Sequence, residues 1–277
     1  MKNLSLGYSP CPNDTFIFYA LIHGLVPLPD AGITERLEDV ETLNSLAVKG
    51  DLDLTKISYH AFGHLRRDYA LLRCGGALGR GCGPLVVARK PVDMRDLKGK
   101  RLAIPGKLTT AGLLLQLYGE GYEDPLILPF HEIMGAVSRG EVDAGVIIHE
   151  SRFTYAAHGL VQVLDLGAWW ETETGLPIPL GGILAKRSLG AELIGRIEAA
   201  LRQSVEYAFS HPEEPKTYIR LHAQEMEDEV IERHIGLYVN DFSLDLGDEG
   251  VQAVQALLAR AEERGLIPSC RLPLFGT

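Results

Sequence analysis

Hydrophobic and polar positions divide the chain into short apolar runs and amphipathic stretches, which is the pattern of an α/β protein. One compact apolar run, residues 144–148, ends directly in four polar residues, His149, Glu150, Ser151 and Arg152. A continuous apolar run of this length is typical of a strand buried on both faces of a sheet. The pattern therefore predicts a buried strand that brings polar side chains to the edge of its sheet.

The same plan occurs twice, in residues 46–60 and 135–150. Each copy has Ala-Val near the end of a helix, a basic residue followed by Gly, an acidic residue, an aliphatic residue and Asp, and then a strand. Glycine after the last turn of a helix supplies the left-handed conformation that ends it. Gly50 and Gly140 are therefore predicted to mark two equivalent helix ends.

Upstream of each copy, the chain has a strand, a loop containing proline and a helix. These helices are predicted to begin near Asp14 and Thr109, because Asp and Thr side chains accept hydrogen bonds from free N–H groups at helix starts. Each half thus resembles a βαβ unit of an open, mostly parallel sheet, in which ligands bind beyond the carboxyl ends of the strands. Two such units facing each other predict two lobes with a cleft between them.

Two segments that hold Gly and Pro beside an apolar strand, residues 76–90 and 176–187, are predicted to pass between the lobes. We therefore expect a first lobe formed by residues 1–90 together with residues 180–277, and a second lobe formed by residues 91–179. The last part of the chain is mostly helical, with apolar residues at three- and four-residue steps that are expected to pack on the first lobe.

Composition narrows the classes of function. Hydrophobic residues at 46% and charged residues at 23% are typical of a globular chain, whereas a net charge of -10 argues against a nucleic-acid surface. A small anionic ligand stays possible, because one lysine or one helix N-terminus binds it locally. No apolar run is long enough to span a membrane, and the first residues lack the features of a signal peptide, so neither a membrane span nor a signal peptide is expected. The four cysteines have no C-x-x-C spacing and are expected to be reduced thiols.

Several motifs are incomplete. The glycine-rich residues 75–84 lack the Lys-Ser/Thr of a phosphate-binding loop, and His131-Glu132 lacks the second histidine of a zinc motif, so no metal is expected. Neighbouring residues on a strand point to opposite faces, so His149, Glu150 and Ser151 are not expected to form a catalytic triad. The remaining histidines show no partner pattern and are expected at the surface or satisfied in the core: His23, His60, His64, His158, His211, His222 and His234.

Five motifs occur in a specific order: SPCPNDTF, DVETLN, TKISY, GGALGRGCGPLVVA and VIIHESRFTY. In these motifs the chain resembles the 1,4-dihydroxy-6-naphthoate synthase family of the futalosine route of menaquinone biosynthesis, and the resemblance extends from Ser9 to about Arg187. It implies a two-lobed fold like that of the type II periplasmic binding proteins. It also implies a cytoplasmic enzyme without cofactors, a carbon–carbon lyase that converts cyclic dehypoxanthine futalosine to 1,4-dihydroxy-6-naphthoate and releases a sugar-derived fragment.

The resemblance also implies roles for individual residues. The histidine of VIIHE is His149, the family's proposed general base. Lys56 and Ser58 of TKIS, and Thr109 and Thr110 of KLTTA, are implied to bind the substrate. A lysine and a helix N-terminus suit the anionic carboxylate of this small-molecule substrate, and a neutral imidazole suits proton removal near neutral pH.

Two further positions, Asp14 and Asn44, match conspicuous family motif residues, but the resemblance assigns them no firm role. Aromatisation of the product supplies a thermodynamic drive, so no redox or metal cofactor is expected.

Three other functions fit parts of the pattern. Chorismate dehydratase is a related family with the same two-lobed architecture and is separated by its substrate. A solute-binding protein would bind its ligand and release it unchanged, and the absence of a signal peptide counts against it. A ligand-sensing domain of a transcription regulator would need a DNA-binding segment, which the sequence does not contain.

Overall fold

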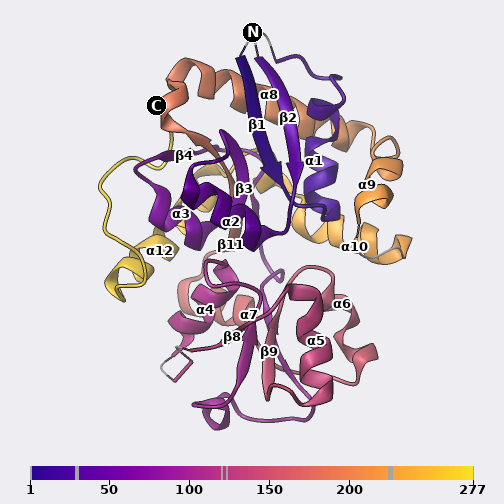
Figure 1. Ribbon diagram of the computed structural model, residues 1–277, viewed down its shortest axis with the longest axis vertical. Helices are drawn as coiled ribbons and strands as arrows, with labels where there is room; N and C mark the ends of the chain where they lie inside the picture. Colours follow the sequence, from indigo (N-terminus) through magenta and orange to yellow (C-terminus); the bar gives the residue numbers. More distant parts are fainter. Residues whose placement is uncertain (1, 29–30, 120, 123, 224–226, 277) are drawn as a thin grey trace.

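The computed structural model describes residues 2–28, 31–119, 121–122, 124–223 and 227–276. They form two α/β lobes, one above the other in Figure 1, each with its own sheet and flanking helices. The predicted fold class, a two-lobed α/β arrangement of open sheets, is therefore confirmed.

The first sheet runs in the order β2-β1-β3-β11-β4, and β5 also pairs with β11. Its strands are β1 (Lys2–Tyr8), β2 (Ala31–Leu37), β3 (Leu54–Ser58), β4 (Tyr69–Leu71), β5 (Ala77–Gly79) and β11 (Ile178–Lys186). The second sheet runs in the order β10-β6-β9-β7-β8. Its strands are β6 (Leu85–Ala88), β7 (Leu102–Ile104), β8 (Leu126–Ile127), β9 (Ala144–Ile147) and β10 (Val161–Asp165).

The two sheets repeat one topology. In the first, β2, β1 and β3 are parallel and β11 is antiparallel to β3. In the second, β8, β7 and β9 are parallel and β6 is antiparallel to β9. The repeat predicted from the sequence therefore corresponds to two equivalent βαβαβ units, each completed by one antiparallel strand.

The helices of the first lobe are α1 (Pro12–Ile22), α2 (Val40–Lys49), α3 (Tyr59–Leu65), α8 (Ala191–Ser210), α9 (Lys216–His222), α10 (Asp228–Tyr238), α11 (Asp241–Leu244) and α12 (Gly247–Glu263). The second lobe has α4 (Thr110–Tyr118), α5 (Phe130–Arg139), α6 (Ser151–Thr154) and α7 (Leu166–Thr174). Single 3₁₀ turns occur at Met94–Leu97, Tyr155–His158 and Arg187–Leu189. Within the described residues, no helix combines the length and the apolar character needed to cross a membrane.

The two predicted helix ends are present. Gly50 ends α2 with φ 74° and Gly140 ends α5 with φ 75°, both in the left-handed region where a side chain would be strained. The aspartates that follow also act alike. Asp53 accepts a hydrogen bond from the N–H of Ser5 at 3.0 Å, and Asp143 accepts one from the N–H of Arg101 at 3.1 Å. Each carboxylate thus ties the start of the third parallel strand of its unit to the first strand.

The chain passes between the lobes earlier than residue 90. Strand β6 (Leu85–Ala88) pairs in the second sheet, and β11, which begins at Ile178, pairs in the first. The second lobe therefore begins about six residues before the boundary expected from the sequence. The reason is physical: an apolar run after a glycine-rich loop suits either sheet, and its own residues do not determine which one takes it.

The late helices pack on the first lobe, as their apolar spacing predicts. The α8 residues Ile197, Leu201 and Val205 are buried in the same cluster as residues of α1. Ser204 joins the two helices directly, because its hydroxyl donates to the carbonyl of Ile17 at 2.7 Å. Helix α1, which carries the first motif of the cleft, is therefore held from behind by the C-terminal part of the chain.

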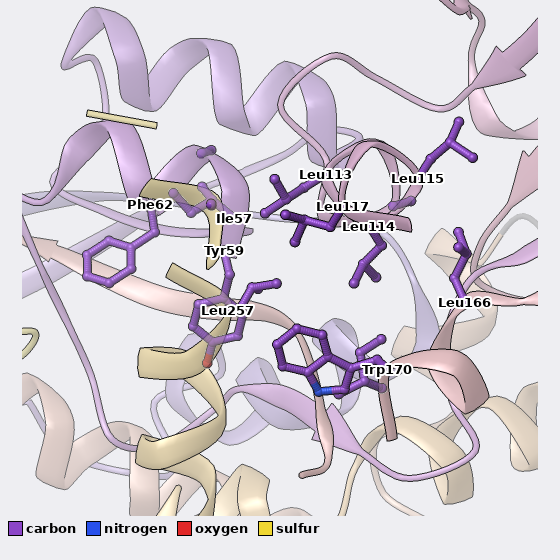
Figure 2. Close-up of a cluster of buried hydrophobic side chains, with 14 of the residues drawn as sticks. Ile57, Tyr59, Phe62, Leu113, Leu114, Leu115, Leu117, Leu166, Trp170 and Leu257 are labelled. Atoms are coloured by element: carbon purple, nitrogen blue, oxygen red, sulfur yellow. The ribbon is translucent and has the colours of Figure 1, made fainter. Parts of the chain in front are cut away.

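One apolar core is shared by the two lobes. Side chains of β3 and α3 (Ile57, Tyr59, Phe62) belong to the same buried cluster as side chains of α4, α7 and α12 (Figure 2). Trp170 of α7 is fully buried there, and its indole N–H donates to the carbonyl of Pro177 at 3.1 Å. The boundary between the lobes is therefore not a cleft throughout, because one side of it is packed like a protein interior.

Candidate active site

A cavity lies between the lobes. All five residues that the family resemblance implies line it: Lys56 and Ser58 from the first lobe, and Thr109, Thr110 and His149 from the second. The carboxyl ends of β3 and β9 lead into this cavity, which is where ligands bind in open α/β sheets. Ser58 ends a strand of the first sheet and His149 follows a strand of the second, so the site is formed only when the two lobes face each other.

Lys56 forms a buried ion pair with Asp14. Its Nζ lies 2.7 Å from Asp14 Oδ1 and also donates to the carbonyl of Gly75 at 3.1 Å. The other carboxylate oxygen accepts hydrogen bonds from the N–H and the hydroxyl of Ser9. An ammonium group has three donors, so one remains for an anionic ligand in the cavity. The motif residue Asp14 therefore orients Lys56.

Ser58 is positioned by Asn44, which is fully buried. The Asn44 amide oxygen accepts from the N–H of Ser58 at 3.0 Å, and its Nδ2 donates to the Ser58 hydroxyl oxygen at 3.3 Å. In the described part of the chain, no acceptor is paired with the Ser58 O–H itself. Ser58 therefore presents one donor to the cavity, and the second conspicuous motif residue, Asn44, holds it there.

The two threonines of KLTTA have internal partners. The Thr109 hydroxyl caps α4, accepting from the N–H of Gly112 at 3.1 Å and donating to the carbonyl of Gly106 at 2.8 Å. Thr110 donates its hydroxyl to the carbonyl of Leu180 in β11 at 2.5 Å. The donors left at this end of the helix are the N–H groups of its first residues, which have no intrahelical acceptor. A ligand carboxylate is therefore better served here by the backbone than by the hydroxyls.

His149 lies in the turn between β9 and α6, just beyond the strand that was predicted to deliver it. It is the one non-glycine residue with positive φ (56°) among the described residues. This left-handed conformation costs energy for a side chain, although His adopts it more often than most residues. The turn aims the imidazole into the cavity, beside the ring of Phe130 at 5.1 Å between centroids. Burial lowers the pKa of His149 below its ordinary 6.5, and the nearby Asp14 opposes this shift.

His234 is a functional candidate that the sequence did not reveal. It was expected at the surface or in the core, and it lies fully buried behind His149, with the two rings parallel and 6.0 Å apart. Its Nε2 lies 2.9 Å from the amide oxygen of Asn13, a residue that lines the cavity. A signal existed in the spacing, because His234 shares the buried face of α10 with Ile231 and Tyr238.

Three side chains place possible metal ligands within 4.8 Å of one another: Cys11, His149 and Glu150. Metal binding needs a deprotonated thiol. Burial raises the pKa of the Cys11 thiol well above its usual range. The three groups therefore fit a metal ion poorly.

Curated proteins with a known activity match the whole chain. The sequence is 58% identical to the 1,4-dihydroxy-6-naphthoate synthase of Thermus thermophilus, over 99% of this chain and 100% of that protein. It is 49% identical to the 1,4-dihydroxy-6-naphthoate synthase of Streptomyces coelicolor, over 96% of this chain and 95% of that one.

Solved structures show the same fold. A protein of Archaeoglobus fulgidus is 38% identical and superimposes with a TM-score of 0.90, covering 96% of this chain and 98% of its own. A Candida albicans protein described as having the generic periplasmic binding protein fold superimposes with a TM-score of 0.68 at 16% identity, covering 98% of this chain and 92% of its own. The family model for menaquinone biosynthesis matches residues 4–263. The chain therefore belongs to the menaquinone biosynthesis family and, within it, to the 1,4-dihydroxy-6-naphthoate synthases.

Proposed function

We propose that the cavity binds cyclic dehypoxanthine futalosine and converts it to 1,4-dihydroxy-6-naphthoate, with His149 as the general base. One observation carries the proposal: an imidazole whose pKa is lowered by burial faces a cavity lined by hydrogen-bond donors from both lobes. A neutral imidazole at physiological pH is ready to accept a proton. The reaction would be that of a carbon–carbon lyase.

Binding of the substrate carboxylate uses donors from both lobes. The remaining N–H of Lys56 and the hydroxyl of Ser58 lie on the first lobe, and the first N–H groups of α4 lie on the second. Hydrogen bonds to charged groups are the strong ones, and the α4 N-terminus adds its dipole. A ligand held from both sides favours the closed arrangement, in which His149 is brought to the bound molecule.

The chemistry can proceed without external redox equivalents. His149 removes a proton from the substrate, and the electron pair left behind forms a double bond of the ring system. The carbon–carbon bond to the sugar-derived fragment breaks at the same time, its electron pair leaves on that fragment, and the fragment takes a proton back from the imidazolium. Formation of the aromatic naphthoate then drives the step. The protein needs to supply a base and to orient the carboxylate, and we assign these roles to His149 and to the donors of Lys56, Ser58 and α4.

The direct experiment is conversion of the purified substrate without added cofactor. Purified protein, treated with a chelator and then desalted, is incubated with cyclic dehypoxanthine futalosine, and 1,4-dihydroxy-6-naphthoate is followed by mass spectrometry. Parallel incubations use chorismate and the His149→Asn variant. We expect naphthoate from the futalosine derivative alone, and a rate at least about 100-fold lower in the variant.

Two results would contradict the proposal. Consumption of chorismate in place of the futalosine derivative would identify a chorismate dehydratase. Recovery of the futalosine derivative unchanged after tight binding would identify a solute-binding protein with no catalytic role for His149.

A further inference from the structure

A series of polar side chains, each in contact with the next, runs behind the cavity from Lys56 to Glu150. Lys56 pairs with Asp14, and the Asp14 carboxylate accepts a hydrogen bond from Asn13 Nδ2 at 2.8 Å. Asn13 Oδ1 faces His234 Nε2 at 2.9 Å, and His234 Nδ1 faces Glu150 Oε2 at 3.8 Å. Glu150 is the neighbour of His149 in the chain, so this series of contacts ends beside the proposed base.

The orientation of Asn13 fixes the tautomer of His234. The Asp14 carboxylate is an acceptor in its pair with Lys56, so the side of Asn13 that faces it must be the NH₂ group. The amide oxygen then faces His234 Nε2, and that nitrogen must carry a hydrogen to make the contact. In a neutral ring the other nitrogen, Nδ1, is therefore a bare acceptor.

Two acceptors would then face each other. His234 Nδ1 and Glu150 Oε2 are both buried, and neither has a hydrogen-bond partner among the described residues. A buried polar atom without a partner is costly, and a carboxylate oxygen facing a nitrogen lone pair adds repulsion. A single proton between the two atoms removes both penalties, and a small side-chain rotation brings them within hydrogen-bond distance.

We propose that Glu150 and His234 hold one proton between them and act as a positioning pair, which keeps the surroundings of His149 electrically neutral so that its imidazole stays a free base. The inference rests on the proposed role of His149 and deepens it. It assigns functions to two residues that do not themselves contact the substrate.

The groups around the pair agree with a neutral arrangement. Burial, then His149 and Lys56, holds the pKa of His234 well below its ordinary range, so a second proton on its ring is disfavoured. The Lys56–Asp14 pair is neutral overall, and Arg152 is paired with Asp165 at 2.7 Å. The titratable or charged groups that face His149 and the pair are Cys11, Asp14, Asp39, Lys56, Arg152 and Tyr238.

The test measures the titration of His149 in the ligand-free protein by NMR, with its ring signals assigned by their loss in His149→Asn. In His234→Gln, the amide can donate to Glu150 but cannot share its proton, so Glu150 ionises. The added negative charge should raise the pKa of His149 by about one unit. In Glu150→Gln, the pair stays neutral, and the pKa of His149 should stay near its wild-type value.

The double variant His234→Gln/Glu150→Gln is the decisive combination. It has no carboxylate beside His149, so the raised pKa of the single His234→Gln variant should return to the wild-type value. A variant of another buried histidine, His60→Gln on α3, is the matched control and should not move the titration. The acid limb of kcat/KM should shift in parallel with the NMR titration in each variant.

Three outcomes would overturn the inference. A fall in the pKa of His149 in Glu150→Gln would show that Glu150 is a bare carboxylate in the wild type. An unchanged titration in a folded His234→Gln protein would show that the pair does not act on His149. If His234→Gln does not fold, Glu150→Gln and the ¹⁵N shifts of His234 in the wild type decide, and a hydrogen on Nδ1 alone would contradict the assignment.

These outcomes distinguish a failure of the proposed Glu150–His234 pair from a failure of the proposed activity. The NMR titration is measured without substrate, so it stands whether or not the protein converts the futalosine derivative. If conversion occurs and the titration of His149 is the same in His234→Gln as in the wild type, the proposed role of the pair is wrong and the proposed activity is supported. If conversion fails and the titration responds, the pair holds and the proposed substrate is wrong.

Discussion

Glu41 on α2 of the first lobe binds Leu108 in the second lobe. Both oxygens of its carboxylate accept from the N–H of Leu108, at 3.1 and 3.3 Å, just before the first turn of α4. Asn44, which holds Ser58, also donates to Glu41 at 3.0 Å. This contact therefore links closure of the lobes to the donors of the cavity.

The Glu41 contact predicts a pH-dependent stability. Burial raises the pKa of Glu41 above 4.5, so the folded state binds a proton there more readily than the unfolded state does. The contribution of Glu41 to the free energy of unfolding is therefore largest below about pH 4.5 and falls as the pH rises through the raised pKa. Glu41→Gln should remove this component. The check is the difference in Tm between variant and wild type, which should move in favour of the variant as the pH rises from about 4 to 7.

An exposed residue supplies the control for that measurement. Glu132 lies in the first turn of α5, the equivalent helix of the second lobe, and is more than half exposed. Glu132→Gln should show a Tm difference that is nearly independent of pH. The same pH response in both variants would mean that the effect is not specific to the interlobe contact.

Two substitutions of His149 should distinguish its role in catalysis from the cost of its left-handed backbone conformation. His149→Asn and His149→Ala should both lower kcat by about 10²–10⁴, because neither side chain takes up a proton near neutral pH. Asparagine tolerates the left-handed conformation better than alanine does, so His149→Ala should be less stable by roughly 1 kcal/mol. Rate measurements and urea unfolding on the same two proteins test both parts. A His149→Asn protein with wild-type turnover would rule out His149 as the base.

The pH profile of the wild-type enzyme follows from the burial of His149. Because its pKa lies below 6.5, the imidazole stays neutral to lower pH than a free histidine does. The acid limb of kcat/KM, which reports the free enzyme, should therefore have its midpoint below pH 6.5. Steady-state rates across the acid range measure it, and a midpoint clearly above that value would contradict the neutral-base assignment.

Ser58 and Thr109 should respond differently, although both are implied to bind the substrate. Ser58→Ala removes a donor to the carboxylate and should raise KM by about 10- to 150-fold with little change in Tm. Thr109→Val removes a helix cap and should cost about 1 kcal/mol of stability with a smaller effect on KM. KM and Tm measured together on both variants distinguish the roles. The reverse ordering would place the carboxylate on the Thr109 hydroxyl.

Lys56 should affect both stability and binding. Lys56→Met leaves the Asp14 carboxylate buried without its partner and should cost about 3–5 kcal/mol of stability. The double variant Lys56→Met/Asp14→Asn should recover much of that stability, because no uncompensated charge remains. Its KM should stay high, since the ammonium donor is still missing. Recovery of binding together with stability would show that Lys56 has only a structural role.

Much of the fold was predictable because its signals are local. The left-handed conformation at Gly50 and Gly140 and the helix cap at Thr109 depend on residues within a few positions of each other. The resemblance placed Lys56 and His149 at one cavity, and the structure brings them to it.

The parts that escaped prediction depend on contacts far apart in the chain. The sheet that takes β6 is decided by its partners β9 and β10, and His234 reaches the cleft because α10 packs behind α1. Two hydroxyls expected to face the substrate are used elsewhere, since Gly106 and Leu180 offer carbonyls that no sequence pattern announces. Pair geometry, such as that of Glu150 with His234, exists only after folding.

The apolar core that spans both lobes sets a limit on how widely the molecule opens. Separating α4 and α7 from α3 and α12 would wet the cluster around Trp170, at about 2.5 kcal/mol for each 100 Å² of apolar surface exposed. Wide opening of the lobes is therefore disfavoured, because it would expose this shared core to water.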